Sequence, residues 1–257
     1  MNYLIGDIGN TSIKICKLNK KFKIIKSFLF DTKDKYLLSR FKKKANKMLK
    51  GNINKKILFS SVVPKVYLKL KKVLKLRKFR PYEIKEFNLK TLMNFKIKNY
   101  NQLGSDRIAN AFGVIEKLKS NYVIIDFGTA TTFDIIKRNN VYDGGIIAPG
   151  IKSSIENLSS STALLPMFKL DKYPSNYGKN TKEALTSGFF WGYQGLINNI
   201  LSKIIKKNGK NCKIVLTGGY SYLFEKRLYK KAKIEKDITM QGIIKIYRNF
   251  PQKLSVQ

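Results

Sequence analysis

The 257-residue sequence contains no histidine. This absence excludes imidazole general bases, Ser-His-Asp triads and histidine-ligated zinc sites. The two cysteines, Cys16 and Cys212, lie far apart and lack the spacing of a metal-binding pair, so we expect reduced thiols in a cytoplasmic core. Any chemistry must therefore use carboxylates, hydroxyls, backbone amides, lysine or arginine.

Long apolar runs are also missing, since no stretch approaches the roughly 20 residues that a membrane-spanning helix needs. The first residues, "MNYLIGDIGNTSIKI", carry Asp7 within their apolar part, which favours a strand over a signal peptide. Hydrophobic residues make up 43% of the chain, which is ordinary for a globular protein and too rich for disorder. We expect a cytoplasmic protein with no membrane partner.

Acidic residues are scarce: 16 Asp and Glu stand against 52 Lys and Arg, and the net charge is +36. Such a charge is typical of proteins that bind nucleic acids or anionic membranes. Mutational drift toward lysine in an AT-rich genome would produce it as well. Because lysines are scattered and far outnumber arginine, the usual reader of bases, we favour drift and expect no specific nucleic-acid partner.

Two halves of the chain open with the same order of elements. Apolar patterns and turn signals predict strands at 2–7, 12–18, 23–30, 55–64, 81–86, 121–127, 130–137, 140–148 and 212–219. Helices are predicted over 33–49, 65–76, 181–207, 222–233 and 237–247, with a further helix starting near Ser105. "LIGDIGNTSIKI" and "IIDFGTATTFDI" align between the halves. We therefore predict a duplicated α/β protein with halves 1–118 and 119–257 and a ligand cleft between them.

In each half a buried strand ends on an aspartate and a tight turn, Asp7-x-Gly9 and Asp126-x-Gly128. A buried carboxylate needs a cation or several donors, and the glycine lets the backbone approach a phosphate. Thr11 and Thr129 add donors for phosphate oxygens, and Asp7 would meet a phosphate-bound Mg²⁺ through water. The alternative is a pair of type I turns with Asx hydrogen bonds, but two such turns at equivalent points favour a phosphate site.

A third turn, "TGGY" at 217–220, ends another apolar strand. Its two glycines would give a flat backbone surface against a nucleotide base or ribose. The alternative is an ordinary turn with a left-handed glycine. Following two Asp-x-Gly turns, the nucleotide interpretation is favoured.

The segment "LGSDRIANAFG" sets Gly104, Ser105, Asp106 and Arg107 at a helix start. A plain helix cap would explain Ser105 or Asp106. An arginine in the first turn opposes the helix dipole and fits that explanation poorly. We predict that Arg107 grips an anionic substrate group while Asp106 accepts a proton from a substrate hydroxyl. The dipole is expected to lower the pKa of Asp106, which phosphoryl transfer tolerates.

The sequence contains, in order, "GDIGNT", "SSVVP", "GSDR", "DFGTATTFD", "GGIIAPG", "TALLP", "NTKEALTSG" and "TGG". This ordered set resembles the type III pantothenate kinases, a family of the acetate/sugar kinase–Hsp70–actin superfamily. The match runs from residue 3 to about 220. The resemblance implies an α/β fold of duplicated ribonuclease-H-like (actin-like ATPase) domains with an interdomain nucleotide cleft, and a homodimer. It also implies transfer of the ATP γ-phosphate to pantothenate, the first step of coenzyme A biosynthesis.

The resemblance also assigns residues. Those implied to bind ATP are Asp7, Ile8, Gly9, Asn10, Thr11, Ser12, Ile13, Lys14 and Thr129. Those implied to bind pantothenate are Gly104, Ser105, Asp106, Arg107 and Thr181, with Asp106 as the proton acceptor. Asp126 would hold a monovalent cation, K⁺ or NH₄⁺, and Mg²⁺ would accompany ATP.

The sequence departs from the family pattern at two points. Some relatives have a substrate-contacting tyrosine seven residues before the glycine of this motif, where the chain has Ile97, and Tyr100 is offset. Ser105 replaces a small apolar residue, a change expected to have no effect.

Two other functions stay open at this point. One is a transcription-accessory or nucleic-acid-binding protein of the same fold, which the charge would suit. The other is a different small-molecule kinase, which "GSDR" and "TALLP" disfavour. The chain is poor in acids and yet contains Asp7, Asp106 and Asp126, which favours the pantothenate kinase.

Overall fold

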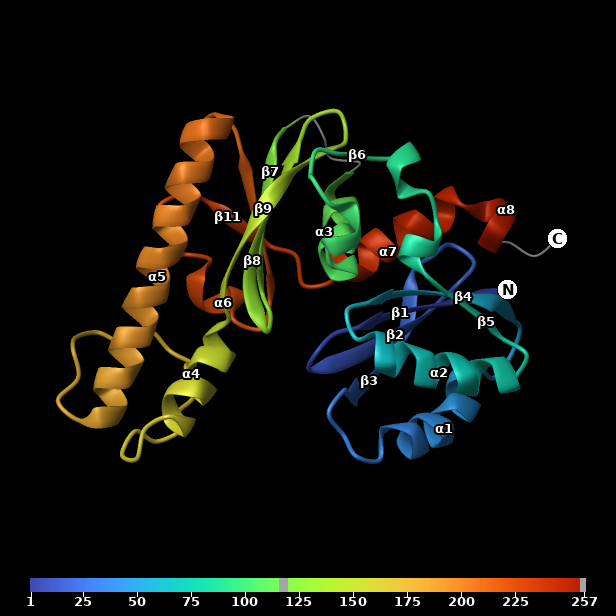
Figure 1. Ribbon diagram of the computed structural model, residues 1–257, viewed down its shortest axis with the longest axis horizontal. Helices are drawn as coiled ribbons and strands as arrows, with labels where there is room; N and C mark the ends of the chain where they lie inside the picture. Colours follow the sequence, from blue (N-terminus) through green and yellow to red (C-terminus); the bar gives the residue numbers. More distant parts are fainter. Residues whose placement is uncertain (116–119, 255–257) are drawn as a thin grey trace. The chain divides into compact units, whose positions relative to one another are not determined.

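The computed structural model describes residues 1–115 and 120–254 (Figure 1). The chain forms two compact units, one of Met1–Glu116 with Asp237–Gln257 and one of Lys117–Lys236. Each unit is built on a β-sheet with helices against it, as expected for the predicted α/β class. Within the described ranges, no helix has the length and apolarity to cross a membrane.

The sheet of the first unit has the strand order β3-β2-β1-β4-β5. Its strands are β1 (Asn2–Ile8), β2 (Ser12–Leu18), β3 (Ile24–Asp31), β4 (Ile53–Ser61) and β5 (Arg80–Glu83). The first three form an antiparallel meander, whereas β4 runs parallel to β1, and β5 parallel to β4. The parallel strands therefore end at one edge, where open α/β sheets bind ligands.

Two pairs of helices complete the first unit. Helices α1 (Leu37–Met48) and α2 (Pro64–Leu76) share a hydrophobic cluster with the sheet that includes Leu4, Ile8 and Phe59. Helices α3 (Ser105–Val114) and α7 (Ile238–Asn249) pack closely on each other and contact β1 and β4. The short elements of this unit are η1 (Ile84–Glu86), η2 (Leu89–Thr91), β6 (Asn94–Phe95), η3 (Tyr100–Gln102) and α8 (Pro251–Leu254).

Residues 237–257 belong to the first unit by their contacts, whereas the sequence assigned them to the second half. The reason is the packing of α7 against α3. Gly113 and Gly242 allow the two helices to approach closely, and a side chain at Gly242 would overlap the carbonyl of Ala109. Thr239 also donates to the amide oxygen of Asn110 at 2.7 Å.

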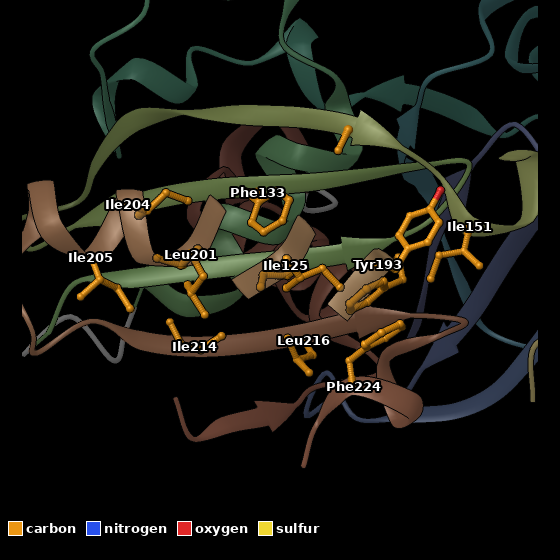
Figure 2. Close-up of a cluster of buried hydrophobic side chains, with 14 of the residues drawn as sticks. Ile125, Phe133, Ile151, Tyr193, Leu201, Ile204, Ile205, Ile214, Leu216 and Phe224 are labelled. Carbon is orange, nitrogen blue, oxygen red and sulfur yellow. The ribbon is translucent and has the colours of Figure 1, made fainter. Parts of the chain in front are cut away.

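In the second unit, strands lie in the order β11-β10-β7-β8-β9. They are β7 (Tyr122–Phe127), β8 (Ala130–Lys137), β9 (Val141–Pro149), β10 (Lys213–Gly218) and β11 (Ala232–Ile234). The meander β7-β8-β9 with β10 parallel to β7 repeats the pattern of the first unit. Helix α5 (Thr181–Asn208) packs on one face of this sheet, where Leu201 and Ile204 meet Ile125 and Phe133 (Figure 2).

Two sequence-based assignments in this unit need correction. The helix predicted over 222–233 is wrong: only α6 (Ser221–Phe224) forms, and β11 follows. Strand β11 pairs with the edge of β10 and satisfies backbone groups that a longer helix would leave unpaired. The sequence also missed α4 (Ile151–Ser160), whose Ile151 and Ile155 are buried in the core. The other long helices and strands are confirmed within a few residues.

Candidate active site

In the first unit the candidate site lies at the carboxyl edge of the parallel strands. Asp7 of β1 is in register with Ser60 of β4, and Phe59 with Glu83 of β5. The side chain of Asp7 is half-buried at this edge. The polar ends of three neighbouring strands therefore converge on one rim, as the sequence predicted for Asp7.

The turn after Asp7 is a tight hairpin. Gly9 donates its backbone N–H to the carbonyl of Ser12 at 2.9 Å. The Thr32 hydroxyl donates to the carbonyl of Gly9 at 2.8 Å, and its N–H bonds to the carbonyl of Thr11 at 3.0 Å. Asn10, Thr11 and Ser12 are exposed, and Thr32, which the sequence analysis did not single out, holds the turn from the next strand connection.

Not every residue of the segment 7–14 can present its side chain to a ligand. Ile8 and Ile13 are fully buried in the core, so only their backbone groups are available. Lys14 is in register with Asp7 and lies on the same face of the sheet, but its ammonium pairs with the carboxylate of Asp237 at 2.6 Å. The sequence contained no signal for this pair, because its members are 223 residues apart.

The segment Gly104–Arg107 is anchored to the same edge. Val62, which follows β4, donates its N–H to the carbonyl of Ile8 at 3.0 Å. A Cβ atom at Gly104 would lie 3.6 Å from Val62 and 2.5 Å from the Oδ1 atom of Asp106. Glycine leaves this carboxylate in place, whereas a side chain at position 104 would displace it. The structure thus brings this motif to the strand edge that carries Asp7.

Helix α3 begins at Ser105, as predicted, with Gly104 as its N-cap. The Oδ1 atom of Asp106 accepts a hydrogen bond from the backbone N–H of Arg107 at 2.7 Å. Ser105 was expected to have no effect, yet it is only 3% exposed and its hydroxyl bonds to the Glu83 carboxylate. Ser105 therefore ties the helix start to the end of β5.

The expected lowering of the Asp106 pKa is wrong. Burial raises the pKa of this carboxyl above its ordinary value, and the hydrogen bond and charge of Arg107 and the charge of Lys85 only partly oppose the effect. Desolvation of a carboxylate therefore outweighs the helix dipole here. A raised pKa makes Asp106 a better proton acceptor than the sequence suggested.

In the second unit, Asp126 sits at the end of β7 between two threonines. It is in register with Thr132 of β8 and with Thr217 of β10, so three oxygen-bearing side chains share one face of the sheet. Asp126 is half-buried and Thr217 is 3% exposed. A carboxylate with neighbouring hydroxyls offers the oxygen ligands that hard cations such as K⁺ and Mg²⁺ take, so these residues fit a monovalent cation. Among the described residues, no group of three or more Asp, Glu or Cys side chains could hold a metal ion.

Thr129 lies at a corner shaped by the first turn of α4. Gly128 closes the turn through its N–H to the carbonyl of Ala130 at 3.1 Å, and the Ser153 hydroxyl donates to the carbonyl of Thr129 at 3.0 Å. A side chain at Gly150 would overlap the Thr129 carbonyl. A cavity of about 610 Å³ opens at this corner, lined by Thr129, Ala130, Pro149, Gly150, Ser153, Ser154, Asn157, Leu158 and Phe189.

The third turn lies beside the second. Gly218 has the left-handed φ of +85°, and a side chain there would meet the backbone of Phe127. Gly219 donates its N–H to the carbonyl of Phe127 at 3.1 Å. The left-handed turn is therefore present, and it lies against the end of β7.

The remaining predicted positions lie elsewhere. Thr181 is the exposed first residue of α5, whose N-cap Asn180 accepts from the N–H of Glu183 at 3.0 Å, and Thr181 does not line the cavity at Thr129. Ile97 is half-buried. Tyr100 stacks edge-on against Phe95, and burial of its hydroxyl raises its pKa to about 12.

Solved structures support the predicted fold. The structure of a putative 2-dehydro-3-deoxygalactonokinase from Sinorhizobium meliloti covers 96% of this chain and 98% of its own, with a TM-score of 0.61 at 9% identity. The structure of an activator of 2-hydroxyisocaproyl-CoA dehydratase from Clostridium difficile with bound ADPNP has a TM-score of 0.56 at 11% identity. It covers 100% of this chain and 98% of its own. These likenesses confirm the predicted duplicated α/β fold of the ribonuclease-H-like type.

Sequence comparisons identify the family. The family model described as type III pantothenate kinase matches residues 3–203. A type III pantothenate kinase from Pelagibacter ubique is 44% identical over 243 residues, which cover 94% of this chain and 97% of that protein. Another from a Sulfurihydrogenibium species is 37% identical over 246 residues, which cover 93% of this chain and 97% of that protein. The chain therefore belongs to the type III pantothenate kinase family.

Proposed function

We propose that this protein transfers the γ-phosphoryl group of ATP to the primary hydroxyl of pantothenate, giving 4'-phosphopantothenate for coenzyme A biosynthesis. Membership of the family is the basis for the reaction. The placement of Asp106 at the strand edge that carries Asp7 is the observation that supports its role best. The nucleic-acid-binding alternative has no support from these findings.

The chemical step follows from the residues at this edge. Asp106 accepts the proton of the pantothenate hydroxyl while the oxygen of that hydroxyl forms a bond to the γ-phosphorus. The bond from that phosphorus to the β,γ-bridging oxygen breaks, and ADP leaves. The raised pKa of Asp106 improves proton acceptance, while positioning and charge neutralisation supply most of the rate.

ATP binding is assigned to the turns. The exposed backbone and hydroxyls of the Gly9–Ser12 hairpin, with Thr129 in the second unit, offer donors to phosphate oxygens. Asp7 would hold Mg²⁺ through water, and Asp126 would hold the monovalent cation. When bound, these cations would supply positive charge that neutralises the phosphates.

The product of the reaction tests this assignment. Purified protein incubated with ATP, Mg²⁺, K⁺ and a panel of pantothenate, sugars and acetate should phosphorylate only pantothenate, at its primary hydroxyl, as seen by mass and phosphorus NMR spectra. Phosphorylation of a sugar instead would assign the protein to another kinase of the superfamily.

Arg107 should contribute mainly to substrate affinity. It lies in the first turn of α3 next to Asp106, where its guanidinium can pair with an anionic group of pantothenate. Arg107→Ala should raise KM for pantothenate roughly 10- to 100-fold, the effect of losing one charge-assisted hydrogen bond, with a smaller change in kcat. An unchanged KM would show that Arg107 is structural.

The protein is further proposed to work as a homodimer in the cytoplasm, where ATP is supplied and buried thiols such as Cys16 and Cys212 stay reduced. One face of α5 supports a dimer, because it exposes small residues together with Trp191, which is 40% exposed. Side chains added at Gly188, Gly192 or Gly195 would meet nothing within 4 Å. Such a face lets two helices approach closely.

Sedimentation analysis should therefore give twice the chain mass of 29.6 kDa. Gly192→Arg, which places a charge in the centre of this face, should shift the protein toward the monomer. The matched control Lys203→Arg should leave the mass unchanged. A monomeric wild-type protein at micromolar concentration would contradict the dimer.

A further inference from the structure

Lys85 is a charged residue beside the candidate base that the sequence analysis did not single out. It lies in η1, two residues beyond Glu83, the last residue of β5. Its side chain is half-buried, unlike the exposed ones of Lys90 and Lys98 nearby. Burial of part of a lysine is costly unless the ammonium meets an acceptor or a negative charge.

The backbone around Lys85 is fixed by hydrogen bonds. The Glu83 carboxylate accepts from the N–H of Lys85 at 2.7 Å, and the Glu86 carboxylate accepts from the N–H of Glu83 at 3.0 Å, which closes a capping box on η1. Glu83 also bonds to the hydroxyl of Ser105 in α3. The corner between β5 and η1 is therefore tied to the helix that carries Asp106.

The ammonium of Lys85 reaches the segment that leads into this helix. Its Nζ atom donates to the carbonyl of Asn101 at 3.0 Å, in η3, three residues before Gly104. Lys85 forms no ion pair with any residue in the described ranges, so one of its three donors is used by a neutral acceptor. Its charge is thus available to the groups around it.

Two carboxyl groups lie within reach of that charge. Lys85 lowers the pKa of both Asp106 and Glu83, in each case against a larger opposing effect of burial. The other cation that acts on Asp106 is Arg107, from the same helix. If Arg107 is used to bind the substrate, its charge is shared with an anion, and the positive charge of Lys85 still favours the ionised form of Asp106.

We propose that Lys85 is a positioning residue for the reaction: its ammonium fixes the segment before Gly104 through the carbonyl of Asn101 and brings a positive charge to the start of the helix that carries Asp106. This inference rests on the proposed function, since it assigns Asp106 the role of base. It gives the segment 83–85 a part in catalysis without contact with the substrate.

The test is the pH dependence of kcat at saturating pantothenate in the intact enzyme, because kcat reports the pKa values of the enzyme–substrate complex. Activity requires ionised Asp106, so it falls as the pH drops through the pKa of this group. Lys85→Gln removes a positive charge and should raise that pKa, which moves the acid limb of the profile to higher pH. Lys85→Arg, which keeps the charge, should restore the wild-type profile.

Lys90→Gln is the matched control, because Lys90 lies on the neighbouring η2 with its ammonium 5.4 Å from the Tyr100 ring centre and does not act on Asp106. Its profile should equal that of the wild type. A Lys85→Gln enzyme with lower kcat but an unshifted acid limb would overturn the proposal and leave a purely structural role. An inactive wild-type enzyme would instead overturn the proposed function.

Discussion

Asp106→Asn should lower kcat by roughly 10²–10⁴, the usual contribution of a positioned general base. Asparagine keeps the size of the side chain and an oxygen that can accept from the N–H of Arg107, so α3 should begin as before. What it loses is the ability to take the proton of the pantothenate hydroxyl. Steady-state kinetics with saturating ATP measures the effect.

The control for this variant is Asp171→Asn, at an exposed loop residue of the second unit. It should keep full activity, and both proteins should show the wild-type melting temperature. If Asp106→Asn turns over at a near-normal rate, Asp106 is not the base and another group must accept the proton.

Asp126→Ala should abolish the dependence of activity on K⁺. Asp126 is the carboxylate in register with Thr132 and Thr217, whereas Asp134 on the same face is fully buried and accepts from the Tyr142 hydroxyl. Without Asp126 the neighbouring hydroxyls have too little negative charge to retain a monovalent cation. The rate of the variant should equal the low rate of the wild type without K⁺. A titration of kcat with KCl at constant ionic strength measures this.

Asp143→Ala is a suitable control, because Asp143 is a carboxylate of the same unit that pairs with Lys137 at 2.7 Å. Its response to K⁺ should match the wild type. If the Asp126→Ala enzyme is still stimulated by K⁺, the cation binds elsewhere and Asp126 has a different role.

Local sequence patterns predicted much of this site. The glycine, serine and aspartate at 104–106 predicted the start of α3 because helix capping depends on a few neighbouring residues. The apolar runs that end at Asp7 and Asp126 predicted the strand ends for the same reason. These features are local, and a single sequence suffices to find them.

The features of the site that the sequence did not predict depend on long-range packing. The pKa of Asp106 was predicted in the wrong direction because its burial depends on the edge of a sheet formed by distant segments. Thr32, Lys85 and Asp237 act through partners that lie 15 or more residues away along the chain, and no local pattern marks them.

Secondary structure failed where tertiary contacts decided between similar patterns. Phe224, Leu228 and Ala232 have helical spacing, but the free edge of β10 favours a strand at 232–234 over a continued helix. Ile151, Ile155 and Leu158 have the same spacing and do form α4, for which the sequence analysis predicted no helix. The same periodicity thus led to opposite outcomes at the two places.

The most direct test of the central claim is a coupled assay that follows ADP release with ATP and Mg²⁺, with and without pantothenate and K⁺. The account predicts ADP formation only when pantothenate is present, matched by an equal amount of 4'-phosphopantothenate and stimulated by K⁺. ADP release that ignores pantothenate, or no phosphopantothenate from folded protein, would contradict it.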